Sequence, residues 1–312
     1  MDKTLQWLLE GDVSLQFQTH KTLLHSSREI LDQLQASIPK EGFGARFLVQ
    51  QHDNGHWGAY YYQPKWTSTH YTLIDLKNLG APKSLVPCRK IIKRMFDECL
   101  TAYGGLNLSK SDIPSDICVD GMILDYSAYF CSDEPRISHL IDHLLGVQKT
   151  DGGFTWDIRV DKSDPHTTIC ILEGLAQCGE ANIAYRSDEI KAARNKALEF
   201  FLSNGLFINS PDERFRKLAF PYRYRYDLLR ILEYFANNEI PFDERMKPAF
   251  DWLLHKQKPD GLWNLELIHP GNVHFQMEEL KGPSRFITQK ALNILRWFSY
   301  QTEKNKTIQL DW

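Results

Sequence analysis

The chain has 312 residues, of which 42% are hydrophobic and 25% are charged, and its formal net charge is −3. This composition predicts a soluble globular protein that can bury a sizeable core, within the size range of one large domain or two ordinary ones. Positive and negative residues are mixed along the sequence, so the charge indicates no general attraction to nucleic acid or to an anionic membrane.

The amino-terminal segment MDKTLQWLLEGDVSLQ lacks the basic start and the long apolar stretch of a secretory signal. No later run reaches the roughly 18 consecutive apolar residues of a membrane span. Six cysteines lie mostly within apolar helical stretches, which is typical of buried thiols in a reducing compartment rather than of a disulfide framework. We therefore expect a cytoplasmic protein without a membrane span.

A repeated turn follows an opening helical pair, which is predicted from Val13 to Leu24 and from Arg28 to Gln51 with an interruption near residues 39–44. The turn has five visible copies: QHDNGHWG at 51–58, YGGL at 103–106, QKTDGGF at 148–154, SNGLF at 203–207 and KQKPDGLW at 256–263. The intervals are 50, 48, 52 and 56 residues between the marker glycines Gly55, Gly105, Gly153, Gly205 and Gly261. Such regular spacing is the signature of a structural repeat.

Two helices are predicted for each repeat, one on either side of the turn. Apolar residues at spacings of three and four predict the first at Val86–Leu100, Arg136–Val147, Ile190–Leu202 and Arg245–Leu254. Glycine suits the end of such a helix because it readily adopts positive φ. The second helix is more apolar and is predicted at Thr69–Leu79, Cys118–Phe130, His166–Gln177, Tyr224–Phe235 and Ser284–Phe298. No strand-like alternation of similar length competes, so the predicted fold class is all-α.

The whole chain, residues 1–312, is interpreted as a single domain with the helical pair at about 4–51, repeats at about 52–300 and a short C-terminal tail. Hairpins of this size stack into an open superhelix or close into a ring. The QxxDGxW-type turns resemble those of the terpenoid cyclase and protein prenyltransferase β-subunit superfamily, from about Gln51 to Arg296. This resemblance implies an α/α toroid of about six helical hairpins around a central cavity.

In such a toroid the second helices point their N-termini toward one mouth of the cavity, so the residues that follow each turn are expected to converge there. These segments are WTSTHY at 66–71, SDICVD at 115–120, SDPHTT at 163–168, PYRYRYD at 221–227 and PSRF at 283–286. Asp164 before a proline has the pattern of a helix N-cap, and Ser68, Asp116 and Ser284 could cap in the same way.

A zinc site is implied by the same resemblance. HTTICILEGL at 166–175 resembles the helix that carries the zinc histidine of prenyltransferase β-subunits, and Asp116-Ile117-Cys118 matches their Asp-x-Cys pair one repeat earlier. Zinc held by Asp116, Cys118 and His166 would keep a fourth position open for a substrate. Because residues two apart cannot share a helix face, Asp116 and Cys118 are expected in extended backbone before the helix. The competing interpretation is a cap, a buried thiol and a core histidine.

The isoprenoid diphosphate site of those enzymes is only partly matched. Lys110 occupies a comparable basic position, but Ile113 and Val119 stand where the family has a basic residue and a tyrosine. RFRKLAFPYRYRYDLLR at 214–230 could replace it, because arginines at the head of a helix suit an anionic group. The alternative is a solvated basic loop, and the patch is too short to indicate nucleic acid. The candidate ligand-binding residues are His70, Lys110, Tyr222, Arg223, Arg225 and Arg285.

Candidate catalytic groups are isolated, because the D-x-D-D run that supplies the acid of the cyclases does not occur. The candidates are Asp120, Tyr226, Asp227 and His274, with Asp125 as a further acid. Aromatic rings could stabilise a carbocation, or could simply form the core. The loop His269–Leu280 would bring His274, Glu278 and Glu279 near Arg285, either as a lid over the mouth or as an ordinary surface loop.

Three functions stay open. The first is a prenyltransferase-like or terpenoid-cyclase-like enzyme that holds a small apolar, isoprenoid-like substrate, with zinc activating a thiol or water. The β-subunits it resembles act with a separate α-subunit, and nothing in this sequence indicates a protein partner. The second is a carbohydrate-active toroid with stacking rings at Trp66, Trp156 and Tyr222 and with paired carboxylates among Asp120, Asp125, Asp157 and Asp227. The third is a non-catalytic ligand-binding toroid.

Overall fold

The computed structural model describes residues 3–109 and 114–310, with side chains through residue 301. Over these ranges the regular structure is helical, and only three isolated β-bridges join loop segments. The prediction of an all-α fold is confirmed. None of the described helices is long and apolar enough to cross a membrane. All six cysteines are buried free thiols, as the sequence predicts.

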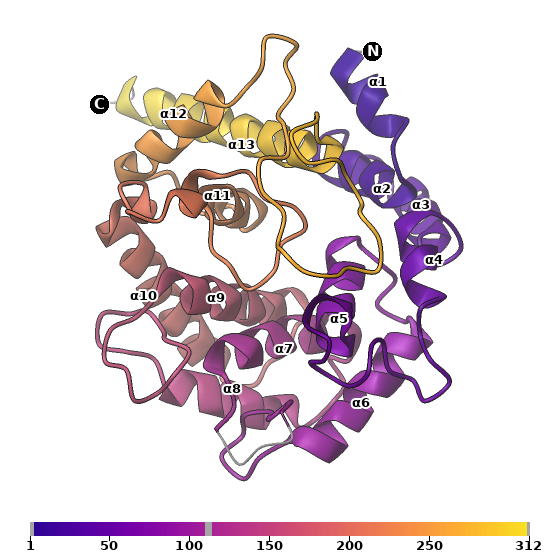
Figure 1. Ribbon diagram of the computed structural model, residues 1–312. Helices are drawn as coiled ribbons and strands as arrows, with labels where there is room; N and C mark the ends of the chain where they lie inside the picture. Colours follow the sequence, from indigo (N-terminus) through magenta and orange to yellow (C-terminus); the bar gives the residue numbers. More distant parts are fainter. Residues whose placement is uncertain (1–2, 110–113, 311–312) are drawn as a thin grey trace.

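Six helices surround a central space, and each contributes side chains to the cavity within it (Figure 1). These inner helices are α2 (Val13–Thr22), α5 (Thr69–Asn78), α7 (Ile117–Phe130), α9 (Pro165–Glu180), α11 (Leu228–Asn237) and α13 (Arg285–Leu310). Helix α13 packs against both α11 and α2, so the last helix meets the first ones and the ring closes. Arg285 Nε donates to the carbonyl oxygen of Trp7 at 3.1 Å, and Gln289 Nε2 donates to Thr22 Oγ1 at 2.7 Å.

The remaining helices lie on the outside of this ring (Figure 1). They are α1 (Lys3–Leu9), α3 (Arg28–Ser37), α4 (Gly42–Leu48), α6 (Val86–Cys99), α8 (Ile137–Gly146), α10 (Ser187–Ser203) and α12 (Lys247–His255). Most predicted bounds hold to within a few residues, but α11 begins at Leu228 and not at Tyr224. Asp227 is extended there and accepts a hydrogen bond from the backbone N–H of Arg230 at 2.9 Å, so it caps the helix and residues 224–226 precede it.

Helix N-caps are placed as predicted at three of four positions. Asp116 accepts from the N–H of Cys118 at 2.9 Å, Asp164 from that of Thr167 at 2.8 Å, and Ser284 Oγ from that of Ile287 at 3.0 Å. Ser68 precedes α5 without a capping hydrogen bond from its side chain.

A glutamine side chain closes three of the repeated turns. Its Nε2 donates to the carbonyl oxygen of the residue four positions later at 2.8, 2.8 and 3.0 Å, from Gln51, Gln148 and Gln257. That residue is a glycine with φ between +84° and +87°, which only glycine adopts readily. The equivalent glycines are therefore Gly104 and Gly152, one position before the markers chosen from the sequence.

In four of the five repeats, the residue that follows the turn is tied to the first turn of the next inner helix. The backbone N–H of this anchor residue donates to a threonine hydroxyl in three pairs, Trp57 to Thr69 at 3.1 Å, Phe154 to Thr168 at 2.9 Å and Trp263 to Thr288 at 3.1 Å. In the fourth of them, Leu106 N–H donates to Asp120 Oδ1 at 2.8 Å, and Ser115 Oγ donates to Asp120 Oδ2 at 2.6 Å. Asp120 thus makes the contact to the turn that a threonine makes in the other three repeats.

Helices α7 and α9 pack closely because glycines face each other. A Cβ on Gly174 would lie 2.6 Å from the carbonyl oxygen of Gly121, which is closer than atoms can approach. We expect Gly174→Ala to lower the free energy of unfolding, measured by urea titration, by about 1–3 kcal/mol. Gly146→Ala in α8 is the matched control, because a Cβ there meets nothing within 4 Å. Equal losses in the two variants would show that the close α7–α9 contact is unimportant.

The segment 264–284 crosses the ring opening and covers the N-terminal ends of the inner helices (Figure 1). Trp66 Nε1 donates to the carbonyl oxygen of Pro270 at 2.7 Å, His274 Nε2 lies 3.1 Å from Thr72 Oγ1, and the Phe275 ring packs on Phe47. His274 therefore reaches α5 and not Arg285. Segment 264–284 contains the loop His269–Leu280, which the sequence analysis considered as a lid over this mouth.

Candidate ligand-binding cavity

A cavity of about 300 Å³ lies at the centre of the ring. Its floor includes buried Asp75 and Arg230, and its rim is formed by exposed side chains where the inner helices end, such as Asn78, Glu180 and Asn237. The volume is at the lower end of the range for small-molecule sites. Since segment 264–284 covers the other end, the cavity opens opposite to the mouth that the sequence analysis favoured.

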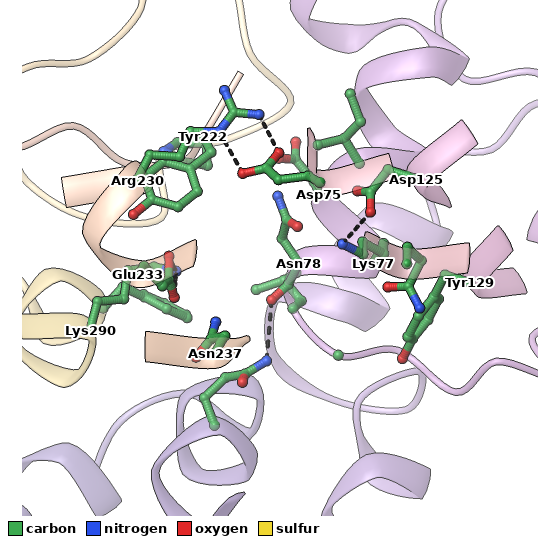
Figure 2. Close-up of a pocket in the computed structure, with 18 of the residues that line it drawn as sticks. Asp75, Lys77, Asn78, Asp125, Tyr129, Tyr222, Arg230, Glu233, Asn237 and Lys290 are labelled. Atoms are coloured by element: carbon green, nitrogen blue, oxygen red, sulfur yellow. Dashed lines mark hydrogen bonds and ion pairs between the residues drawn. The ribbon is translucent and has the colours of Figure 1, made fainter. Parts of the chain in front are cut away.

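Four ion pairs form much of the cavity wall. They are Asp75–Arg223, Lys77–Asp125 at 2.8 Å, Glu173–Arg230 at 2.5 Å and Glu233–Lys290 at 2.6 Å. Three of these pairs join neighbouring inner helices, and the first joins α5 to the segment before α11. Figure 2 shows Asp75, Lys77 and Asp125 on one side of the cavity and Arg230, Glu233 and Lys290 on the other.

These pairs make the wall polar but balanced in charge. Burial raises the pKa of Asp75 and of Asp125, and Arg223 and Lys77 respectively oppose that rise. A buried carboxylate is tolerated only when a cation and hydrogen bonds compensate for lost water. Each carboxylate in the four pairs has such a cation. Lys21, Lys83 and Glu180 also line the cavity, but as exposed side chains at its rim. The deeper part of the wall therefore has no local excess of either charge.

Amides and aromatic rings fill the spaces between the ion pairs. The lining side chains of these two kinds include Gln18, Gln35, Asn78, Gln177, Asn237, Asn238, Gln289, Phe17, Tyr129, Phe220, Tyr222, Tyr234 and Phe286. On the cavity wall, Lys290 Nζ lies over the ring of Tyr222, 4.6 Å from the ring centroid. Of the predicted ligand-binding residues that the structure describes, Tyr222 alone lines this cavity.

The predicted zinc ligands are engaged in other contacts. Asp116 caps α7, and Cys118 lies within the first turn of that helix, not in extended backbone before it. The hydrogen bond with Cys170 and burial raise the pKa of the Cys118 thiol, whereas zinc binds a thiolate. His166 Nδ1 accepts from the backbone N–H of Tyr226 at 2.8 Å. Among the residues that the structure describes, no group of three His, Cys, Asp or Glu side chains is placed to hold a metal ion. The zinc site stays a prediction.

The other catalytic candidates also lie outside the cavity lining. Tyr226 donates its hydroxyl to the carbonyl oxygen of Leu206 at 2.5 Å and stacks on Phe201 in the core. Asp227 caps α11, and burial raises its pKa to about 7. His274 belongs to the covering segment, and burial lowers its pKa.

Only part of the predicted ligand-binding set comes together. Tyr222, Arg223 and Arg225 line a second, much smaller pocket with His166, Tyr226 and Asp227. His70 is buried, its Nδ1 lies 3.3 Å from the Tyr126 hydroxyl, and burial lowers its pKa to about 3. Arg223 is committed to Asp75, and Arg225 Nε donates to the Tyr224 hydroxyl at 3.3 Å. Arg285 takes part in ring closure, and Lys110 and Ile113 lie outside the described residues.

No protein-family model matches the chain, and a comparison with curated proteins finds no match. The resemblance to the prenyltransferase and cyclase superfamily therefore stays a prediction based on the turns and on the Asp-x-Cys and histidine segments.

The charged residues on the inner faces were missed by the sequence analysis, although the sequence carries a signal for them. Asp75 and Lys77 interrupt the apolar pattern of α5, Glu173 that of α9, and Arg230 and Glu233 that of α11. Charged side chains are almost never fully buried unless paired. Several charged side chains within the most apolar helices of one chain therefore indicate that these helices enclose a polar cavity. Of the four carboxylates weighed for a carbohydrate site, only Asp125 lines the cavity.

Proposed function

We propose that this protein binds a neutral, hydroxyl-rich small molecule of the sugar class in its central cavity. The observation that carries the proposal is the charge-balanced wall, in which every carboxylate of the four ion pairs already has a cationic partner. The ligand enters where the inner helices end, because segment 264–284 covers the opposite mouth.

A neutral ligand suits this wall better than a charged one. A charged group would add uncompensated charge or displace one partner of an ion pair, and leaving a buried charge without its partner costs about 3–5 kcal/mol. Hydroxyl groups can donate to the remaining lone pairs of the carboxylates and accept from the amides of Asn78, Asn237 or Gln289 without any change in charge. Aromatic rings such as Tyr129 and Tyr222 offer apolar faces beside them.

An isoprenoid suits the wall poorly. Apolar groups would remove water from the ion pairs and supply no hydrogen bonds in return. A diphosphate would need unpaired cations within the cavity, whereas Arg230 is held by Glu173, Lys77 by Asp125 and Lys290 by Glu233. The two lysines outside these pairs, Lys21 and Lys83, lie exposed at the rim. We propose binding rather than hydrolysis, because a glycosidase needs one proton-loaded carboxyl group and each paired carboxylate here is bonded to a cation.

Saturation-transfer NMR tests the proposal with glucose, N-acetylglucosamine, maltose and myo-inositol as probes, and with farnesol and geranyl diphosphate for comparison. We expect at least one of the hydroxyl-rich probes to bind with a Kd of about 1 mM or lower. Tyr222→Ala should weaken that binding at least fivefold, whereas Tyr185→Ala, on the outer surface, should leave it unchanged. Binding of farnesol or geranyl diphosphate with no response to any sugar or inositol would contradict the proposal.

A further inference from the structure

Asp75 has a buried oxygen atom without a partner. The side chain is 1% exposed and lies at the wall of the central cavity. Arg223 Nη1 donates to its Oδ1, but Oδ2 has no hydrogen-bond partner in the part of the chain that the structure describes. Buried polar atoms are nearly always hydrogen-bonded, because leaving one unpaired is unfavourable. The site therefore lacks one donor.

The neighbouring cations are committed elsewhere. Lys77, on the same helix, donates to Asp125. Arg230 donates to Glu173 and to the carbonyl oxygens of Arg223 and Arg225. Asp75 lines both the central cavity and a smaller pocket beneath segment 264–284. The smaller pocket has about 20 Å³, enough for a single water, so a ligand can reach Asp75 only from the central cavity.

We infer that Asp75 is the deepest contact of the bound ligand and that its Oδ2 accepts a hydrogen bond from a hydroxyl group of that molecule. This inference rests on the proposed function. Arg223 already neutralises the Asp75 carboxylate, so an ammonium donor would bring an unbalanced positive charge beside a buried arginine. An uncharged hydroxyl supplies the same hydrogen bond without it. Asp75 is thus a specificity-determining residue that selects hydroxyl over ammonium at one position of the ligand.

The test compares the sugar that binds best with its monodeoxy and monoamino derivatives on the wild-type protein. We expect one position at which removal of the hydroxyl, or its replacement by an ammonium group, weakens binding at least tenfold. In Asp75→Ala the gap between the sugar and that deoxy derivative should close to less than twofold, because alanine can neither accept from nor donate to the hydroxyl. Asp133→Ala, in an exposed ion pair with Arg89, is the control and should keep the full gap.

The outcomes separate the two claims. If the wild-type protein binds no sugar, the proposed function fails and the inference falls with it. If sugars bind but the tenfold gap persists in Asp75→Ala, the hydroxyl contacts another group and the role of Asp75 is refuted. Should Asp75→Ala fail to fold because Arg223 loses its anion, the double variant Asp75→Ala, Arg223→Gln removes both charges and is expected to close the gap in the same way. A monoamino derivative that binds more tightly than the sugar would also overturn the inference.

Discussion

Replacing Arg230 by alanine is expected to lower the free energy of unfolding by about 3–5 kcal/mol. The side chain is 3% exposed. Its guanidinium donates to both carboxylate oxygens of Glu173 and to the carbonyl oxygens of Arg223 and Arg225. It therefore joins α9, α11 and the segment before α11, and its loss leaves a partly buried carboxylate and two carbonyl groups without their donor.

Arg245→Ala is the matched control for this measurement. Arg245 also bonds two carboxylates, Glu199 and Asp243, but its side chain is 43% exposed. Water replaces such contacts readily, so the expected loss is below about 1 kcal/mol. Urea unfolding followed by circular dichroism compares the two variants. If Arg230→Ala were as mild as Arg245→Ala, the ion pairs around the cavity would not be holding the inner helices together.

Asp227→Asn is expected to make the protein more stable than the wild type at neutral pH and equally stable in acid. Burial raises the pKa of Asp227 to about 7, whereas the unfolded chain has its ordinary value of 3.8. Between these values the native state binds more protons than the unfolded state, so this group's contribution is fully present below pH 4 and is lost as the pH rises toward 7. At 1.36 kcal/mol per pH unit the loss amounts to about 4 kcal/mol. Asparagine keeps the cap of α11 and does not titrate.

The pH dependence of the difference between variant and wild type is the decisive readout. The gap in unfolding free energy should widen from pH 4 to pH 7 and stay constant above it. Asp243 is a cap with the opposite shift, because a hydrogen bond from Arg245 lowers its pKa. Asp243→Asn should therefore destabilise the protein near neutral pH and lose that effect in acid. A gap for Asp227→Asn that does not change with pH would show that this carboxyl has an ordinary pKa.

The helical framework could be predicted because its determinants are local. Apolar spacing sets each helix, and a glutamine, a glycine and an anchor residue set each turn through contacts within a few residues, as at Gln148, Gly152 and Phe154. The predicted start of α11 was too early, because Tyr224 and Tyr226 extend the apolar pattern of that helix toward the N-terminus. The helix begins only after Asp227, which is its N-cap.

The candidate site could not be predicted in the same way, because its pairings join residues from distant repeats. Asp75 and Arg223 are 148 positions apart, and no local pattern links them. The Asp-x-Cys pair has two interpretations, because the spacing that suits a metal also suits an N-cap, in which Asp116 accepts from the backbone of Cys118. The residue types and their spacing alone cannot tell metal binding from helix capping. The charged residues within the apolar inner helices, by contrast, could have indicated the polar cavity.

The proposed ligand occupies the polar cavity where the inner helices end. A crystal structure of the protein grown with the sugar that binds best in solution shows whether it does. We expect density for the sugar between Asp75 and Asp125 on one wall and Tyr222 and Glu233 on the other. Density beneath segment 264–284, beside Cys118 and His166, with the central cavity holding only water, would contradict it.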